Sequence, residues 1–117
     1  MTFPLEGHRL GFGAAPLGNL YRRVGDAEAE ATLAAALSGG IGYVDTAPHY
    51  GQGLSERRLG AYGGAPVLSS KVGRVLRPIA PPPPGTERHG FIDGDPYEPV
   101  FDYTGDGVVR SLEGRQK

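Results

Sequence analysis

Asp45, Tyr50 and Lys71 are the residues whose types and spacing could do chemistry together. Two short apolar runs, Ile41–Asp45 and Pro66–Val72, have the length and composition of strands. Since alternate residues of a strand face the same side, one face carries Ile41, Tyr43 and Asp45, and another carries Val67, Ser69 and Lys71. An acid and a lysine therefore end two apolar stripes at the carboxyl ends of neighbouring strands, where α/β proteins build their sites, and Tyr50 follows on the loop above.

The chemistry of this trio would be proton transfer. A tyrosine with an ordinary pKa of about 10 is a poor acid at neutral pH. A nearby ammonium favours the phenolate and lowers that pKa, and a carboxylate holds the ammonium in place. Such a phenol can give a proton to a carbonyl oxygen or take one from an alcohol. The spacing alone fits a surface salt bridge beside a turn tyrosine better than it fits catalysis.

The elements that must position these residues alternate between strand and helix. We expect a helix from Asp26, which can cap it, to Gly39-Gly40, where glycine adopts the left-handed cap without steric cost. Its apolar stripe consists of Ala29, Leu33, Ala36 and Leu37. A short helix over residues 55–59, closed by Gly60 and Gly63-Gly64, precedes the second apolar run. This alternation predicts βα units around a parallel sheet, an α/β fold.

The N-terminal segment predicts a strand that runs into a Gly/Pro loop over Leu10–Gly18. Residues 1–10 are expected to form a small hairpin with Glu6-Gly7 as its turn. Gly11–Pro16 comes close to the dinucleotide fingerprint, but proline replaces the third glycine and the next helix begins near residue 26. A tight turn at a strand end is therefore preferred to a Rossmann site.

Residues 73–103 show no periodicity and are rich in glycine and proline, so we expect a long irregular loop. Pro81 to Pro84 favour an extended polyproline conformation. The basic residues Lys71, Arg74, Arg77 and Arg88 gather at its start, and the acidic residues Asp93, Asp95, Glu98, Asp102 and Asp106 at its end. The basic group leaves open a small anion-binding module. After the loop, Thr104 would cap the start of a truncated helix over residues 104–117, of barely two turns and with nothing following for it to pack under.

Composition excludes several classes of protein. Glycine (20) and proline (11) make up about 26 % of the 117 residues, near the level at which composition suggests disorder. The net charge of −1 gives no sign of nucleic acid or an anionic membrane as a partner. Without an 18-residue apolar run or a signal-peptide pattern, we expect a soluble, cytoplasmic protein. Since cysteine is absent, disulfides, thiol catalysis and thiolate metal sites are excluded.

No metal site is expected from the remaining ligand types. Asp93–Glu98 resembles a calcium loop, but Tyr97 and Glu98 stand where a ligand and the obligatory glycine are needed. The three histidines lie far apart in the sequence. Only Asp45 and His49 could share a site, and two ligands do not make a metal centre.

Several segments together resemble the aldo-keto reductase superfamily. They are Leu10–Tyr21, Gly42–Gly51 with D-T-A-P-H-Y-G, Leu54–Gly60 with S-E-R-R-L-G, and Leu68–Arg74 with S-S-K-V-G-R. A further segment, Phe101–Ser111, is most similar to the sugar-dehydrogenase branch, the D-threo-aldose 1-dehydrogenase or L-fucose dehydrogenase group. The resemblance covers residues 8–113.

The resemblance implies an NAD(P)-dependent oxidoreductase acting on an aldose, or on another carbonyl or alcohol substrate, and built as a (β/α)8 TIM barrel. By motif, Tyr50 would be the general acid/base, Lys71 would lower its pKa, and Asp45 would pair with Lys71. Gly13, Ala14 and Asp45 would bind the cofactor, NAD or NADP, although many members carry threonine in place of Ala14. Residues 1–72 would hold the first βα units, and residues 73–103 would line the substrate mouth.

The length of the chain limits how much of a TIM barrel it can form. A TIM barrel needs roughly 250 residues, so 117 residues provide about three βα units and an incomplete barrel. The catalytic histidine of the family follows the fourth strand, and His89 comes too early to replace it. The alternative is a catalytically inactive, partly disordered truncation product or interaction fragment that associates through its open sheet edge. The sequence leaves open which sugar is used and whether NAD or NADP is preferred.

Overall fold

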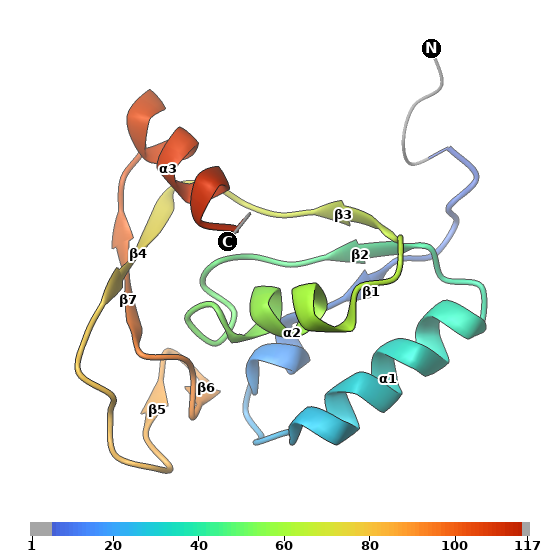
Figure 1. Cartoon of the computed structure of the whole chain (residues 1–117), viewed down its shortest axis with the longest axis horizontal. Helices are drawn as coiled ribbons and strands as arrows, with labels where there is room; N and C mark the ends of the chain where they lie inside the picture. Colours follow the sequence, from blue (N-terminus) through green and yellow to red (C-terminus); the bar gives the residue numbers. More distant parts are fainter. Residues whose placement is uncertain (1–5, 116–117) are drawn as a thin grey trace.

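Three short parallel strands form the sheet that carries the candidate residues. The computed structural model describes residues 6–115, in which β1 (Phe12–Gly13), β2 (Tyr43–Asp45) and β3 (Val67–Ser69) lie side by side in that order (Figure 1). The register pairs Gly13 with Asp45 and Asp45 with Ser69. The carboxyl ends of the three strands therefore meet at one edge, as the sequence predicts for a parallel sheet.

Helices follow the first two strands, so the predicted α/β order is confirmed. A 3-10 turn, η1 (Ala15–Gly18), and helix α1 (Asp26–Ser38) connect β1 to β2. Helix α2 (Leu54–Tyr62) connects β2 to β3. These connections make the first two βα units of the chain.

The start of α1 differs from the sequence prediction, whereas its end agrees. Gly25 is the N-cap, and Asp26 is the first helical residue rather than the cap. Its carboxylate instead pairs with the Arg58 guanidinium, with a nitrogen–oxygen distance of 3.0 Å. The helix stops at the predicted glycines, where Gly40 has a φ of +100° that few other residues adopt.

Helix α2 is longer than the sequence predicts. Gly60 does not close the helix but lies within it, and the helix ends at Gly63, which has a φ of +74°. A glycine inside a helix costs only about 1 kcal/mol relative to alanine. The burial of Leu59 in the core offsets that cost, and the helix continues to Tyr62.

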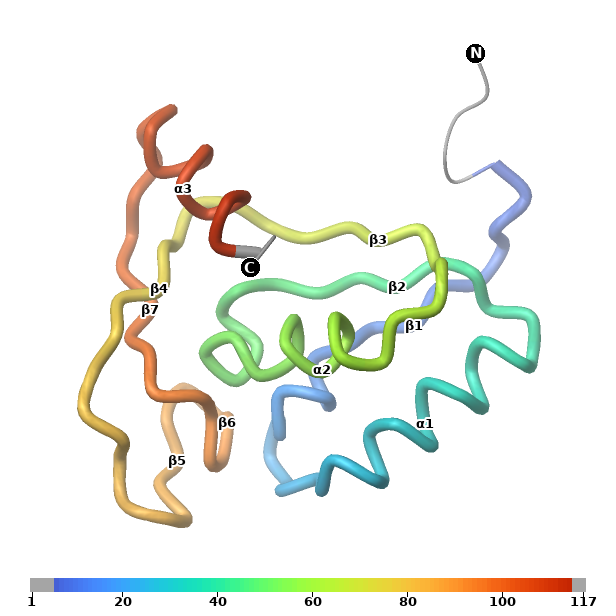
Figure 2. The backbone as a smooth tube through the Cα atoms, in the orientation of Figure 1, coloured from blue at the N-terminus to red at the C-terminus, as the bar shows by residue number. Residues whose placement is uncertain are grey.

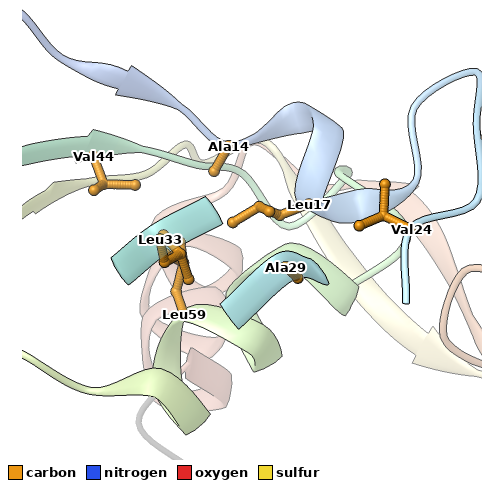
Figure 3. Close-up of a cluster of buried hydrophobic side chains, with 7 residues drawn as sticks. All are labelled: Ala14, Leu17, Val24, Ala29, Leu33, Val44 and Leu59. Carbon is orange, nitrogen blue, oxygen red and sulfur yellow. The ribbon is translucent and has the colours of Figure 1, made fainter. Parts of the chain in front are cut away.

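One face of the sheet is covered by the two helices and forms the core. Val44 in β2 is fully buried against side chains from α1 and α2 (Figure 3). The core cluster consists of Ala14, Leu17, Val24, Ala29, Leu33, Val44 and Leu59. Because alternate residues of a strand point to opposite faces, Tyr43 and Asp45 lie on the face that the helices leave open.

The segment from residue 73 to 103 is not the irregular loop that the sequence predicts. Strands β4 (Arg74–Pro78) and β7 (Tyr97–Phe101) form an antiparallel ladder, and between them β5 (Glu87–Arg88) pairs with β6 (Phe91–Ile92). Figure 2 shows the chain running away from the parallel sheet after β3 and returning with β7 beside β4. We call residues 73–103 the excursion. Residues 79–86 and 93–96 form neither helix nor strand, with a turn at residues 84–85.

Helix α3 (Gly105–Arg115) follows the excursion, and its predicted cap is confirmed. The backbone N–H of Gly107 donates to the Thr104 hydroxyl over 3.0 Å, as an N-cap requires. The described helix is longer than the two turns predicted, and it packs against β4, which precedes it in the chain.

Two further predictions concern the N-terminal hairpin and the open edges of the parallel sheet. Glu6-Gly7 forms the predicted turn, but residues 8–10 form no strand, and the first arm of the predicted hairpin lies outside the described residues. Within residues 6–115, no strand pairs with the outer edge of β1 or β3, which fits a partial barrel. None of the described helices is both long enough and apolar enough to cross a bilayer.

Candidate active site

The strand register brings the acid and the lysine into contact, as strand parity predicts. Lys71 follows the end of β3, and its ammonium donates to Asp45 Oδ2 over 2.7 Å and to the Thr46 carbonyl over 3.0 Å. Both side chains remain partly open to solvent, with 48 % of Lys71 and 40 % of Asp45 exposed. The pair therefore lies at the rim of the sheet edge, where a small molecule can reach it.

Tyr50 joins this pair from the loop between β2 and α2. The Lys71 ammonium lies 4.9 Å from the centre of the Tyr50 ring. The loop that carries Tyr50 is fixed by a close backbone crossing, since a Cβ on Gly18 would lie 2.5 Å from the Tyr50 carbonyl carbon. A Cβ on Gly51 would in turn lie 2.6 Å from the Gly18 carbonyl oxygen. Only glycine at both positions lets the loop approach η1 this closely.

The contacts of Asp45 and Lys71 stabilise the charged form of both groups. Burial acts to raise the pKa of Asp45, but hydrogen bonds from Lys71 and Ser69 and the Lys71 charge outweigh it and hold that pKa below its usual value. Burial acts to lower the pKa of Lys71, but interactions with Asp45 and Tyr50 outweigh it and raise that pKa. Asp45 is therefore a carboxylate and Lys71 an ammonium at neutral pH.

Two hydroxyl groups that the sequence prediction did not use are linked to Asp45, one directly and one through the other. Ser69 donates to Asp45 Oδ1 over 2.6 Å, and the Tyr43 hydroxyl lies 2.7 Å from Ser69 Oγ. Strand parity places all three residues on one face, so this signal was present in the sequence. It was overlooked because an isolated serine on a strand has no distinctive motif.

Gly13 and Ala14, the residues predicted to bind a cofactor, differ in accessibility. Gly13 is exposed, and beyond its chain neighbours no described atom lies within 4 Å of a Cβ built on it. Ala14 is fully buried, its N–H donates to the Asp45 carbonyl, and its carbonyl accepts from the buried Ser55 hydroxyl over 2.9 Å. Of the two, only Gly13 offers surface to a ligand.

An aromatic group from the loops stands next to Tyr50. The Tyr50 ring lies 6.1 Å from the buried Phe91 ring, and His49 lies 5.5 Å from Phe91 and 5.3 Å from His89, centre to centre. Burial and the nearby charges of Arg74 and His89 lower the pKa of His49, so its imidazole is neutral at neutral pH. The 73–103 excursion thus supplies part of the wall beside the candidate site.

The basic residues that suggested an anion-binding module are each held by internal partners. Lys71 pairs with Asp45, Arg77 with Glu98, Arg88 with backbone carbonyls, and Arg74 stacks on Phe101. Their positive charge is therefore distributed over separate contacts. Across residues 6–115, no three side chains of ligand type gather as a metal centre would require.

A groove of 1190 Å³ opens between α2, the β4–β7 ladder and α3. Its lining includes Arg57, Leu76 and Arg110, but none of Asp45, Tyr50 and Lys71. The chemistry-bearing residues therefore lie outside this groove.

The sequence matches proteins of known activity over most of its length. The pattern of the Aldo/keto reductase family covers residues 9–113. A D-threo-aldose 1-dehydrogenase from a Pseudomonas species is 44 % identical over 92 % of this chain, and a pyridoxal 4-dehydrogenase from Microbacterium luteolum is 41 % identical over the same share. The chain spans about a third of these relatives, 35 % of each.

Solved structures with the same fold extend the comparison. The aldo-keto reductase AKR11C1 from Bacillus halodurans superposes with a TM-score of 0.58 at 27 % identity, covering 92 % of this chain and 32 % of that protein. The glycerol dehydrogenase AKR11B4 from Gluconobacter oxydans gives a TM-score of 0.61 at 22 % identity, with coverages of 90 % and 30 %. At that identity the second likeness concerns the fold alone.

Proposed function

The chain belongs to the Aldo/keto reductase family, and from this premise we propose that Asp45, Tyr50 and Lys71 are the proton-transfer residues of an NAD(P)-dependent oxidoreductase site. The observation that carries the proposal is the contact of the Lys71 ammonium with both Asp45 Oδ2 and the Tyr50 ring. The substrate would be an aldose, oxidised at its anomeric carbon, or another carbonyl or alcohol compound.

In this proposal Tyr50 moves the proton. In the oxidative direction its phenolate takes the proton of the substrate hydroxyl, and in the reductive direction its phenol protonates the carbonyl oxygen. The Lys71 ammonium, 4.9 Å from the ring centre, stabilises the negative charge on the tyrosine oxygen. The Asp45 carboxylate and the Thr46 carbonyl accept from that ammonium and so fix its position.

The cofactor would be NAD or NADP, held against Gly13 and Asp45. The exposed backbone of Gly13 pairs with Asp45 in the sheet and leaves room for a flat ring beside the carboxylate. When bound, the nicotinamide supplies or accepts the hydride. Ala14 would act by holding the loop, since its buried atoms already bond to Asp45 and Ser55.

The names of the relatives suggest the substrate class. Two of them, the D-threo-aldose 1-dehydrogenase and an L-galactose dehydrogenase from Arabidopsis thaliana, are sugar dehydrogenases by name, and the second is 47 % identical over 44 % of this chain. The pyridoxal 4-dehydrogenase is named for an aromatic substrate. An aldose is therefore the first substrate to test and pyridoxal the second.

The experiment measures NAD(P)H formation by the purified chain with L-fucose, D-arabinose or pyridoxal. We expect Tyr50→Phe to lower turnover by at least about a hundredfold, because the proton carrier is removed. Tyr21→Phe is the matched control, since Tyr21 is 80 % exposed and lies outside the segment predicted to line the substrate mouth. Turnover that survives Tyr50→Phe, or none from a folded chain, contradicts the proposal.

A second candidate is a catalytically inactive, partly disordered fragment that associates through its sheet edges. It is favoured by the outer edges of β1 and β3, which pair with no other described strand, and by the share of the relatives that the chain spans. Circular dichroism and size-exclusion chromatography separate the candidates. A monomer with a cooperative thermal transition contradicts the second one.

A further inference from the structure

We propose that Ser69 is a positioning residue for the site, because it links the Tyr43 hydroxyl to Asp45 Oδ1 and so turns Asp45 Oδ2 toward Lys71. This inference rests on the proposed function for its catalytic meaning, but its geometry stands without it. Ser69 touches none of the groups that would react, so its effect would pass entirely through Asp45.

The direction of each hydrogen bond in this link follows from the number of protons available. Asp45 is a carboxylate and can only accept, so Ser69 must donate its single hydroxyl proton to Oδ1 over 2.6 Å. Ser69 Oγ can then only accept from Tyr43 over 2.7 Å. The chain of donors therefore runs one way, from Tyr43 through Ser69 to Asp45.

The two oxygens of Asp45 consequently have separate tasks. Oδ1 is held from the β3 side by Ser69, and Oδ2 accepts from the Lys71 ammonium over 2.7 Å. Since 40 % of the Asp45 side chain is exposed, water competes for both oxygens. A donor fixed on a strand limits rotation of the carboxylate, whereas Lys71 alone, on a flexible side chain, would not.

The strand framework explains why Ser69 can hold this position. Asp45 and Ser69 are direct register partners in β2 and β3, and Tyr43 lies two residues before Asp45 on the same face. All three backbones are fixed by the parallel ladder. The hydroxyl positions are therefore set by the sheet and not by a loop.

The test compares two variants of nearly the same shape. Ser69→Val removes the hydroxyl, whereas Ser69→Thr keeps it, and both are β-branched residues that suit a strand. The measurement is the titration of the Asp45 carboxyl carbon by NMR in the full chain. We expect Ser69→Val to raise the pKa of Asp45 and Ser69→Thr to leave it unchanged, because only the former loses the donor to the charged form.

A neighbouring serine provides the control. Ser70 is exposed and donates to Glu56 Oε2 over 3.0 Å, away from Asp45, so Ser70→Val should leave the Asp45 titration unchanged. Equal titrations in Ser69→Val and Ser69→Thr overturn the proposal. Should Ser69→Val fail to fold, Tyr43→Phe decides: it should raise the Asp45 pKa by a smaller amount, and an unchanged titration overturns the link.

Turnover separates this inference from the proposed function. If the chain oxidises an aldose, Ser69→Val should lower kcat about tenfold with little change in KM, and Ser69→Thr should restore kcat. If the chain shows no turnover while the Asp45 titration moves as expected, the proposed function fails and the positioning role stands. If turnover is present but insensitive to Ser69→Val, the positioning role fails alone.

Discussion

The sheet region and the β4–β7 excursion both border the candidate site, but different forces hold them together. Every residue of the core cluster lies between Ala14 and Leu59. Among the described residues after Val72, Phe91 is the single buried apolar side chain. The excursion is held instead by polar contacts, such as those from Arg88 to two backbone carbonyls and the Arg57–Asp95 ion pair. Thus the sheet that carries Asp45 and Lys71 is held by apolar packing, whereas the excursion beside it is held mainly by hydrogen bonds and ion pairs.

We expect the largest difference in stability between the two regions when one leucine in each is replaced by alanine. Leu33 is 1 % exposed in the core, whereas Leu76 in β4 is only half-buried. We expect Leu33→Ala to lower the free energy of unfolding by about 2.7–5 kcal/mol, and Leu76→Ala by less than half as much. Urea denaturation of both variants measures this, and equal losses would mean that the excursion is as well packed as the sheet region.

The next largest difference in stability is expected between variants of two adjacent arginines, Arg58 and Arg57. The Arg58 side chain is 10 % exposed and donates to the carbonyls of Leu17 and Val24 and to Asn19 Oδ1. Arg58→Met would take this donor from both carbonyls, whereas Asn19 Oδ1 would keep the Val24 N–H. We expect a loss of about 2–3 kcal/mol. Arg57 is 58 % exposed in its pair with Asp95, so Arg57→Met should cost less than about 1 kcal/mol. Thermal melts at low and high salt test the Arg57–Asp95 pair. A loss for Arg58→Met that high salt abolishes would mean that its pair with the exposed Asp26, and not its buried carbonyl contacts, carries the stability.

Acid titration compares one carboxylate from each region. Hydrogen bonds from Thr104 to Asp102 lower its pKa, as the contacts described above do for Asp45. A depressed folded-state pKa adds stability that is present above the unfolded value of 3.8 and is lost as the pH falls through the folded value. We expect Asp45→Asn and Asp102→Asn each to flatten the pH dependence of unfolding below pH 3.8. If the free energy of unfolding of either variant depends on pH as in the unsubstituted chain, that carboxylate does not contribute to acid unfolding.

The smallest expected changes in stability, which are opposite in sign, come from replacing one glycine in each region with alanine. Gly60 lies inside α2 with nothing within 4 Å of a built Cβ, so Gly60→Ala should raise stability by about 0.5–1 kcal/mol. Gly85, in the turn of the excursion, also has open space but a φ of +83°, so Gly85→Ala should lower stability by about 1 kcal/mol. Calorimetry measures the thermal unfolding midpoints of the two variants. If both midpoints shift in the same direction, the difference in backbone conformation does not decide the effect.

Strand parity and turn glycines were enough to predict the sheet region from the sequence. The parity of Asp45 and Lys71 predicted their contact because a two-residue period leaves few other arrangements in a parallel sheet. The contact of Ser69 with Asp45 was missed, although strand parity placed both residues on one face, because an isolated serine on a strand has no distinctive motif. The catalytic roles of Asp45, Tyr50 and Lys71 stay predictions.

The excursion escaped prediction because its strands do not look like strands. Pro78 ends β4 and Pro99 lies within β7, and proline lacks the backbone donor of a regular ladder. The ladder forms because its two arms meet in space, with Arg77 opposite Glu98, and these arms lie far apart in the sequence. A local pattern cannot report a pairing that depends on such a distant partner.

The backbone crossing of Gly18 and Gly51 has a consequence for how this sequence can change over generations. A side chain at position 18 would collide with the peptide of Tyr50, and one at position 51 would collide with the peptide of Gly18. Neither collision is relieved by a change at the other position, since each involves main-chain atoms. The two glycines should therefore be inherited as a fixed pair, and libraries that randomise either position should return glycine alone among members that keep Tyr50 in place.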